Sequence, residues 1–120
     1  MINNQAGGLL KAESSYSAIY FSGNLDASVT NNGQIQSVGD YYAAGIYTSG
    51  ELTGAISNTA DASITADAIG GSTATAYGIY TNGMGADSSI SNAGTISATA
   101  TSTSYSAEAY GILTGSLGDN

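Results

Sequence analysis

The sequence predicts an all-β fold, a parallel β-helix (β-solenoid) of about four rungs, each 27–34 residues long with three short strands. Two unrelated phrases recur with the same spacing. A tyrosine- and glycine-containing phrase places isoleucines at 19, 46, 79 and 112, in steps of 27, 33 and 33 residues. A Ser-Ile-Ser-Asn phrase places apolar residues at 2, 29, 56 and 90, in steps of 27, 27 and 34. Because both phrases keep one period, we interpret each period as one rung.

Within each period the pattern indicates three strands separated by tight corners. Apolar and small polar residues alternate in residues 63–66 and 95–100, and a period of two is typical of a strand. A repeat of two shorter turns stays open, but the Asn-Gly phrase occurs once per period and favours one turn. The periods differ in length mainly in the return stretch, such as residues 98–110, which we expect to bulge or to carry loops. The general preference of parallel crossovers predicts a right-handed coil.

The whole chain, residues 1–120, is expected to form a single β-solenoid segment, a slice of a longer repeat array. It starts inside one of the repeated phrases, and neither end shows a polar cap or a helix. The open strand edges of such a segment predict self-association through the solenoid ends.

Charge and composition exclude several function classes. Lys11 is the one cation against nine acids, so no basic patch for nucleic acid can form. The chain has no histidine and no cysteine, which removes the commonest general base, metal ligands and thiol nucleophile. The acids, among them Asp61 and Asp67, are spread one or two per rung. We therefore expect no catalytic residues, no metal, no cofactor and no enzymatic activity.

A column of asparagines follows the second phrase. Asn4, Asn31, Asn58 and Asn92 each lie two residues after an apolar residue. Asparagine tolerates the backbone of sharp corners, and stacked amides can both donate and accept hydrogen bonds along the axis. We interpret these four residues as a structural ladder at a turn.

A column of tyrosines follows the isoleucines. Tyr20, Tyr47 and Tyr80 come directly after their isoleucines, so they are predicted to point outward, with Leu113 interrupting the column. An outward row of rings could bind a ligand by stacking on sugars, or the rings could simply stack on one another. Tyr77 and Tyr110 share the isoleucine parity and are predicted to point inward.

The phrases at residues 76–83 and 89–98 resemble the repeats of bacterial autotransporter passenger domains, and the resemblance covers nearly the whole chain. It implies export by the type V route and display outside the cell, at a bacterial surface. The expected function is therefore that of a stalk or a multivalent adhesin that contacts a host or neighbouring-cell surface and its glycans. Two alternatives stay open: a carbohydrate-binding module that uses the tyrosine column, and a filament subunit that stacks end to end.

Overall fold

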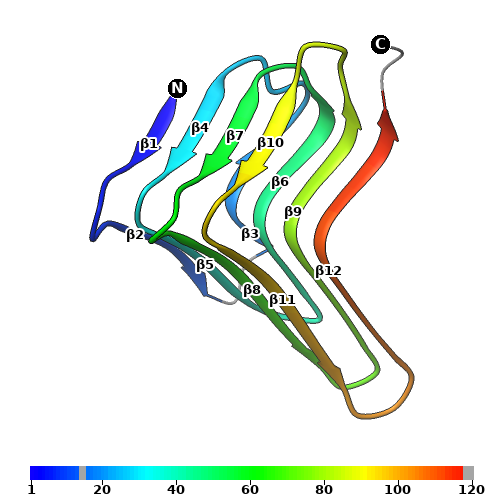
Figure 1. Ribbon diagram of the computed structural model, residues 1–120. Coiled ribbons are helices and arrows are strands. Elements are labelled where there is room, and N and C mark those ends of the chain that lie inside the picture. The colour runs from blue at the N-terminus through cyan, green and yellow to red at the C-terminus, as the bar shows by residue number, and fades with distance from the viewer. Residues whose placement is uncertain (14–15, 118–120) are drawn as a thin grey trace.

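The computed structural model describes residues 1–13 and 16–117, and within these residues the chain forms twelve β-strands (Figure 1). No helix in this part of the chain is long and apolar enough to cross a membrane. The strands are β1 (Ile2–Asn4), β2 (Leu9–Glu13), β3 (Ser17–Phe21), β4 (Ser28–Asn31), β5 (Gln34–Asp40), β6 (Tyr42–Leu52), β7 (Ala55–Asn58), β8 (Ser63–Gly70), β9 (Thr73–Met84), β10 (Ser89–Asn92), β11 (Thr95–Ser102) and β12 (Ser106–Leu117).

These strands build three parallel four-stranded sheets. Sheet A has the order β1-β4-β7-β10, sheet B the order β2-β5-β8-β11 and sheet C the order β3-β6-β9-β12. Each rung contributes one strand to each sheet, so one period of the sequence is one turn of the coil. Ile46 pairs with Ile19 on one side and with Ile79 on the other, as the spacing predicts. The predicted β-helix of four rungs with three strands each is confirmed.

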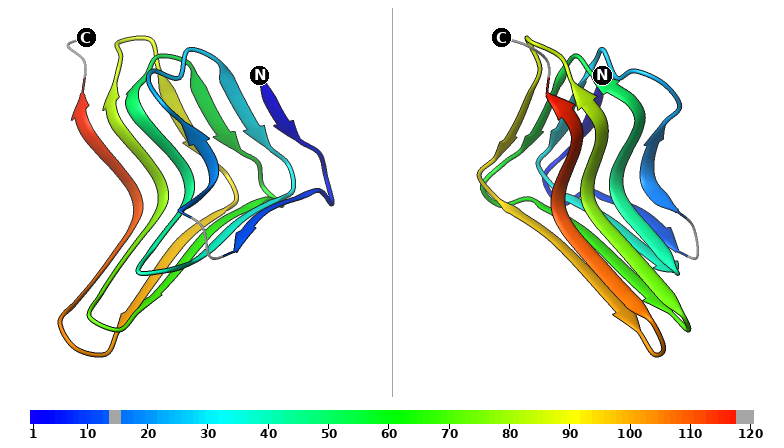
Figure 2. Two further views of the ribbon diagram at one scale, coloured as in Figure 1. Left: turned by 180° about the vertical axis from the view of Figure 1, so that it is seen from behind. Right: turned by 90° about the vertical axis from the view of Figure 1, so that its right-hand side faces the viewer.

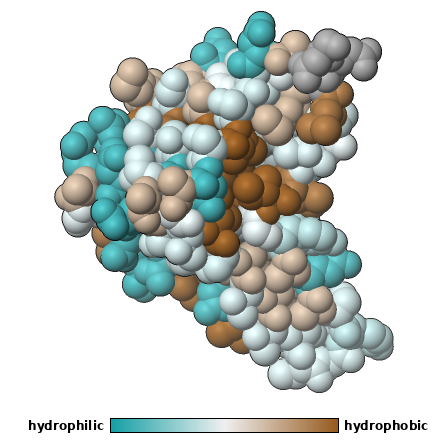
Figure 3. Space-filling view, viewed as in Figure 1, coloured by the Kyte–Doolittle hydropathy of each residue, from teal (hydrophilic) through white to brown (hydrophobic). Residues whose placement is uncertain are grey.

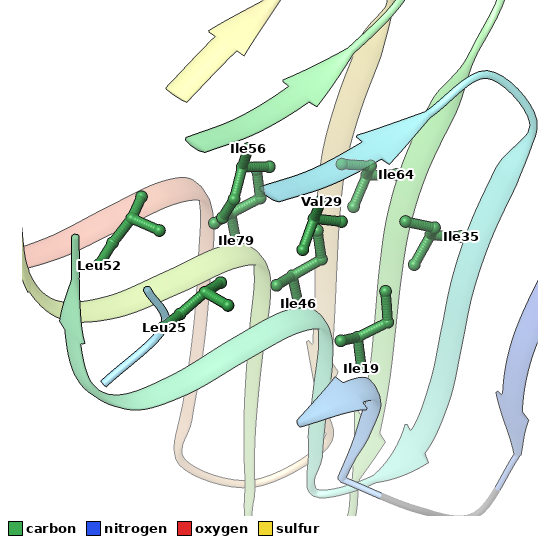
Figure 4. Close-up of a cluster of buried hydrophobic side chains, with 9 residues drawn as sticks. All are labelled: Ile19, Leu25, Val29, Ile35, Ile46, Leu52, Ile56, Ile64 and Ile79. Carbon is green, nitrogen blue, oxygen red and sulfur yellow. The ribbon is translucent and has the colours of Figure 1, made fainter. Parts of the chain in front are cut away.

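Branched aliphatic side chains fill the space that the three sheets enclose, which we call the body (Figure 4). They alternate with outward residues along each strand, as a half-buried strand requires. Nine of them form one buried cluster: Ile19, Leu25, Val29, Ile35, Ile46, Leu52, Ile56, Ile64 and Ile79. Each rung buries its apolar side chains on the next, so a thin core extends along the stack.

Beyond the body, the later rungs continue into a flat two-layer extension, visible at the lower right of Figure 1. There the C-terminal half of sheet B lies against the N-terminal half of sheet C. Alanines fill the contact: Ala43, Ala66, Ala68, Ala74 and Ala76 are buried, and Ala98 and Ala100 pack against them. Such small side chains let two sheets approach closely. The extra residues of the longer periods therefore widen the rung by lengthening strands: the return stretch bulges, as one of the two expected outcomes, and it does so with paired strands and not with loops.

Sheet C bends where the body meets the extension (Figure 2, right). Gly45 and Gly78 lie at the bend, and a Cβ atom on Gly45 would come within 2.6 Å of the Gly78 carbonyl oxygen. The alternation of inward and outward side chains resets here, because both Ala76 and Ile79 point inward although they lie three residues apart. Tyr77 and its register partner Tyr110 therefore point outward, and the predicted inward direction of both is wrong.

The rung formed by β10, β11 and β12 leaves apolar side chains open, and they gather in the middle of the face seen in Figure 3. In this rung Ile112 is 45% exposed and Leu117 is 72% exposed. The same positions of inner rungs are covered, since Ile79, the register partner of Ile112, is fully buried.

Candidate functional site: a groove lined by tyrosines

The asparagine column forms the predicted ladder inside one corner of the body. The side-chain amide nitrogens of Asn4, Asn31 and Asn58 each donate to the side-chain oxygen of the next asparagine at 2.8 Å, and the ladder ends at Asn92. The same nitrogens also donate to backbone carbonyl oxygens, those of Gln34, Ser63 and Thr95. Because the amides of the buried members are engaged within the protein, the column holds the corner together.

The predicted tyrosine column lies on the outer, concave side of sheet C. The rings of Tyr20 and Tyr47 stack at 5.5 Å, and those of Tyr47 and Tyr80 at 4.7 Å, each pair within 11° of parallel. Their outward direction is confirmed, and Tyr20 is 58% exposed. Since the rings lie face to face, the central ring of Tyr47 offers its edge and its hydroxyl to a ligand, whereas its two faces are covered.

A second tyrosine column runs beside the first, on the other side of the bend. Tyr77 and Tyr110 occupy one register row and stack at 5.5 Å and 17°. The same row holds Ser17 and Ala44 in the two earlier rungs. The missing rings are supplied by Tyr16 and Tyr42, whose centroids lie 5.7 Å apart, and Tyr42 lies 5.6 Å from Tyr77.

These substitute rings do not restore the regular stack. The ring planes of Tyr16 and Tyr42 are inclined by 53°, and those of Tyr42 and Tyr77 by 60°. The angles are steep because the side chains of Tyr16 and Tyr42 start from positions near the register row and not from the row itself. The two columns touch through Tyr77 and Tyr80 and through Tyr42 and Tyr47. Together the columns form one groove, which we call the tyrosine groove: Tyr16, Tyr20, Tyr42, Tyr47, Tyr77, Tyr80 and Tyr110.

A hollow of about 580 Å³ opens in the groove where the stack is irregular. Its walls are Tyr16, Ser17, Tyr20, Tyr42 and Tyr47. Sequence reasoning identified Tyr20 and Tyr47 but missed the other three. The signal that could have found them is the change of residue type along one row, from serine and alanine to tyrosine and tyrosine, because it marks a break in the repeat.

Burial is the largest cause that raises the pKa of Tyr42, Tyr47 and Tyr77 above the usual value of a phenol, and the neighbouring tyrosines raise each of these pKa values further. The hydroxyl oxygens of Tyr42 and Ser17 are shielded from solvent and have no hydrogen-bond partner among the described residues. The groove therefore offers ring faces, ring edges and uncharged hydroxyls.

Such a surface is suited to binding by stacking and hydrogen bonding. One acid lies at the end of the groove, where the Tyr110 hydroxyl donates to the Glu108 carboxylate at 3.5 Å. In the described part of the chain, no three His, Cys, Asp or Glu side chains lie close enough together to hold a metal ion. Lys11 pairs with Glu13 on β2, which belongs to sheet B. Comparison with known protein families, with curated proteins and with solved structures finds no match for this chain.

Proposed function

We propose that the chain is a structural and adhesive module of an extracellular protein at a bacterial surface, a β-solenoid segment of an autotransporter-like passenger. The observation that carries the proposal is the in-register stacking of four rungs, which joins residues 25 to 34 positions apart through sheet and amide ladders. Stacked in this way, the rungs act as a stiff spacer. The module serves as a stalk or as a multivalent adhesin.

The repeated rungs supply the adhesive part of this role. Rungs stack at a spacing of about 4.8 Å, so equivalent outward side chains recur at fixed intervals along the coil. Weak contacts that recur at a fixed spacing add through effective concentration, without any single strong site. The tyrosine groove is a surface of this kind, and it faces the partner surface in this proposal. Self-association through the solenoid ends stays a prediction.

Export by a translocator tests this proposal. The chain would replace part of the passenger of an unrelated autotransporter in a Gram-negative bacterium, with the native signal and barrel left in place. We expect the hybrid to reach the surface and to show there a protease-resistant fragment of the length of this chain. A matched variant, Ile64→Ala, removes a fully buried side chain and should be degraded faster. Retention of the unaltered hybrid inside the cell, or its full degradation at the surface, would contradict the proposal.

A further inference from the structure

We propose that the hollow between Tyr16, Tyr20, Tyr42, Tyr47 and Ser17 binds one ring of an uncharged pyranose sugar. This inference does not depend on the export route or on the stalk role, because it rests on the geometry of the groove alone. The hollow lies where Tyr16 and Tyr42 take the place of the register-row residues Ser17 and Ala44 in the second tyrosine column. Their tilted rings leave a space beside Tyr20 and Tyr47, and a flat ring of similar width would fill it.

The rings of the walls are inclined to one another around the hollow, and some of their faces have no stacked partner. Tyr42 stands nearly perpendicular to Tyr47, with centroids 6.3 Å apart and planes at 72°. Tyr16 is 73% exposed and tilted away from Tyr42, so its ring is not covered by a parallel neighbour. Tyr20 stacks on Tyr47 with one face, and its other face has no ring partner among the described residues. In the later rungs, by contrast, Tyr77 and Tyr110 lie nearly parallel and leave no such space between them.

The unpaired hydroxyls of Ser17 and Tyr42 indicate a ligand that carries hydroxyls of its own. A buried hydroxyl without a partner costs about 1–3 kcal/mol. Both residues line the hollow, and we expect a bound sugar to reorient their side chains so that its hydroxyls pair with these oxygens. A sugar combines the two features that the walls require, an apolar C–H face for stacking and hydroxyls at its rim.

Charge narrows the class of ligand further. The lining residues are four tyrosines and one serine, so no side chain in the walls neutralises a charged ligand. The net charge of -8 repels anionic sugars. A quaternary ammonium ion could rest against the rings. It has no hydroxyl, however, so it would leave the hydroxyls of Ser17 and Tyr42 without a hydrogen-bond partner. The volume of about 580 Å³ lies within the range of roughly 300–1,000 Å³ that is usual for small-molecule sites.

Tyrosine fluorescence of the intact chain tests the proposal, since the chain has nine tyrosines and no tryptophan. Cellotetraose, maltotetraose and the fully N-acetylated chitotetraose, all uncharged, would each be titrated, with tetramethylammonium as the cationic comparison. We expect saturable binding of at least one of the three sugars. Tyr20→Ala and Ser17→Tyr should each weaken it at least ~10-fold, the first by removing a wall and the second by filling the hollow with a ring.

The matched control is Tyr110→Ala, which removes a stacked ring at the far end of the same groove and should change the affinity by less than about 2-fold. Circular dichroism of every variant shows whether it is folded. One weakening variant enlarges the hollow and the other fills it, so if one of them misfolds, the other still tests the proposal. The proposal is overturned if none of the three sugars binds. It is equally overturned if Ser17→Tyr binds as well as the parent chain, or if tetramethylammonium competes for the site more tightly than every sugar.

Discussion

The body and the extension are made from the same strands of sheets B and C, yet different side chains hold them together. In the body three sheets enclose a space that isoleucines, leucines and a valine fill, together with the asparagine ladder. In the extension two sheets face each other directly, and small residues separate them, mostly alanines, with Ser37 and Gly39 in the same inward rows. The comparison indicates that the volume of the inward side chain sets the cross-section of each rung. Large residues keep the coil open, and small residues flatten it.

The largest effect is expected from emptying the body. Ile64→Ala removes most of a side chain that is fully buried between the rungs, and we expect it to lower the free energy of unfolding by about 2–5 kcal/mol. Ile69 lies on the same strand but points outward and is 56% exposed, so Ile69→Ala is the matched control, with a change within about 0.5 kcal/mol. Urea denaturation measures both. Equal losses in the two variants would show that the burial pattern of β8 is incorrect.

Breaking the asparagine ladder is the next largest perturbation. Asn31 donates to Asn58 and to the Ser63 carbonyl oxygen, and it accepts from Asn4, so Asn31→Ala leaves several buried groups unpaired. We expect a loss of about 2–3 kcal/mol in the same denaturation experiment. Asn92→Ala changes the exposed end of the ladder and should cost less than about 1 kcal/mol. A smaller effect at Asn31 than at Asn92 would contradict the role of the ladder.

Filling the extension tests the opposite side of the comparison. Ala76→Leu forces a large side chain between two sheets that alanine keeps close, and we expect it to destabilise the fold by about 1–3 kcal/mol. Thr75→Leu introduces the same side chain one residue earlier, on the outward side of β9, and should be nearly neutral. If Ala76→Leu stabilised the chain, as it would in an underpacked core, the account of the extension would be wrong.

Alkaline pH should produce the smallest effect, and it reports on the bend between the two regions. Burial raises the pKa of Tyr42, Tyr47 and Tyr77 above the ordinary value of 10.0, so the folded chain holds these protons more tightly than the unfolded chain. Stability is therefore independent of these groups below about pH 10 and decreases as the pH rises above it. Denaturation curves at increasing pH measure the slope.

The control for this pH dependence is Tyr42→Phe. It removes one of the titrating groups together with an unpaired hydroxyl, so it should flatten the decline without loss of stability at neutral pH. A decline as steep as that of the parent chain would mean that Tyr42 does not titrate differently in the folded state.

The sequence predicts the body well because two independent columns fix its register. The isoleucine rows and the asparagine ladder lie as their spacing requires, and a shift of one residue would turn every core side chain outward. The outward tyrosines of the first column follow from the same alternation.

The second tyrosine column escapes this reasoning for two reasons. A glycine inside a strand, such as Gly78, allows the bend at which the alternation resets, and a period of two does not show where that happens. In addition, Tyr16 and Tyr42 lie before the residues of the register row in the sequence. The spacing of the repeat therefore does not show that their rings join the column, which depends on the directions of the side chains in the folded chain. The repeat pattern does not predict the hollow, so the binding of a sugar there is a prediction from the folded geometry alone.

Cross-linking of introduced cysteines tests most directly the central claim, that one period of the sequence is one in-register turn. The chain has no native cysteine, and Thr65 pairs with Ser97 on the outward side of sheet B. Paired Cα atoms in neighbouring strands lie about 4.8 Å apart, within disulfide range, whereas an offset of two residues puts them about 8 Å apart. We predict that Thr65→Cys with Ser97→Cys forms a disulfide readily and that Thr65→Cys with Thr99→Cys does not. Preferential cross-linking of the offset pair would contradict the account.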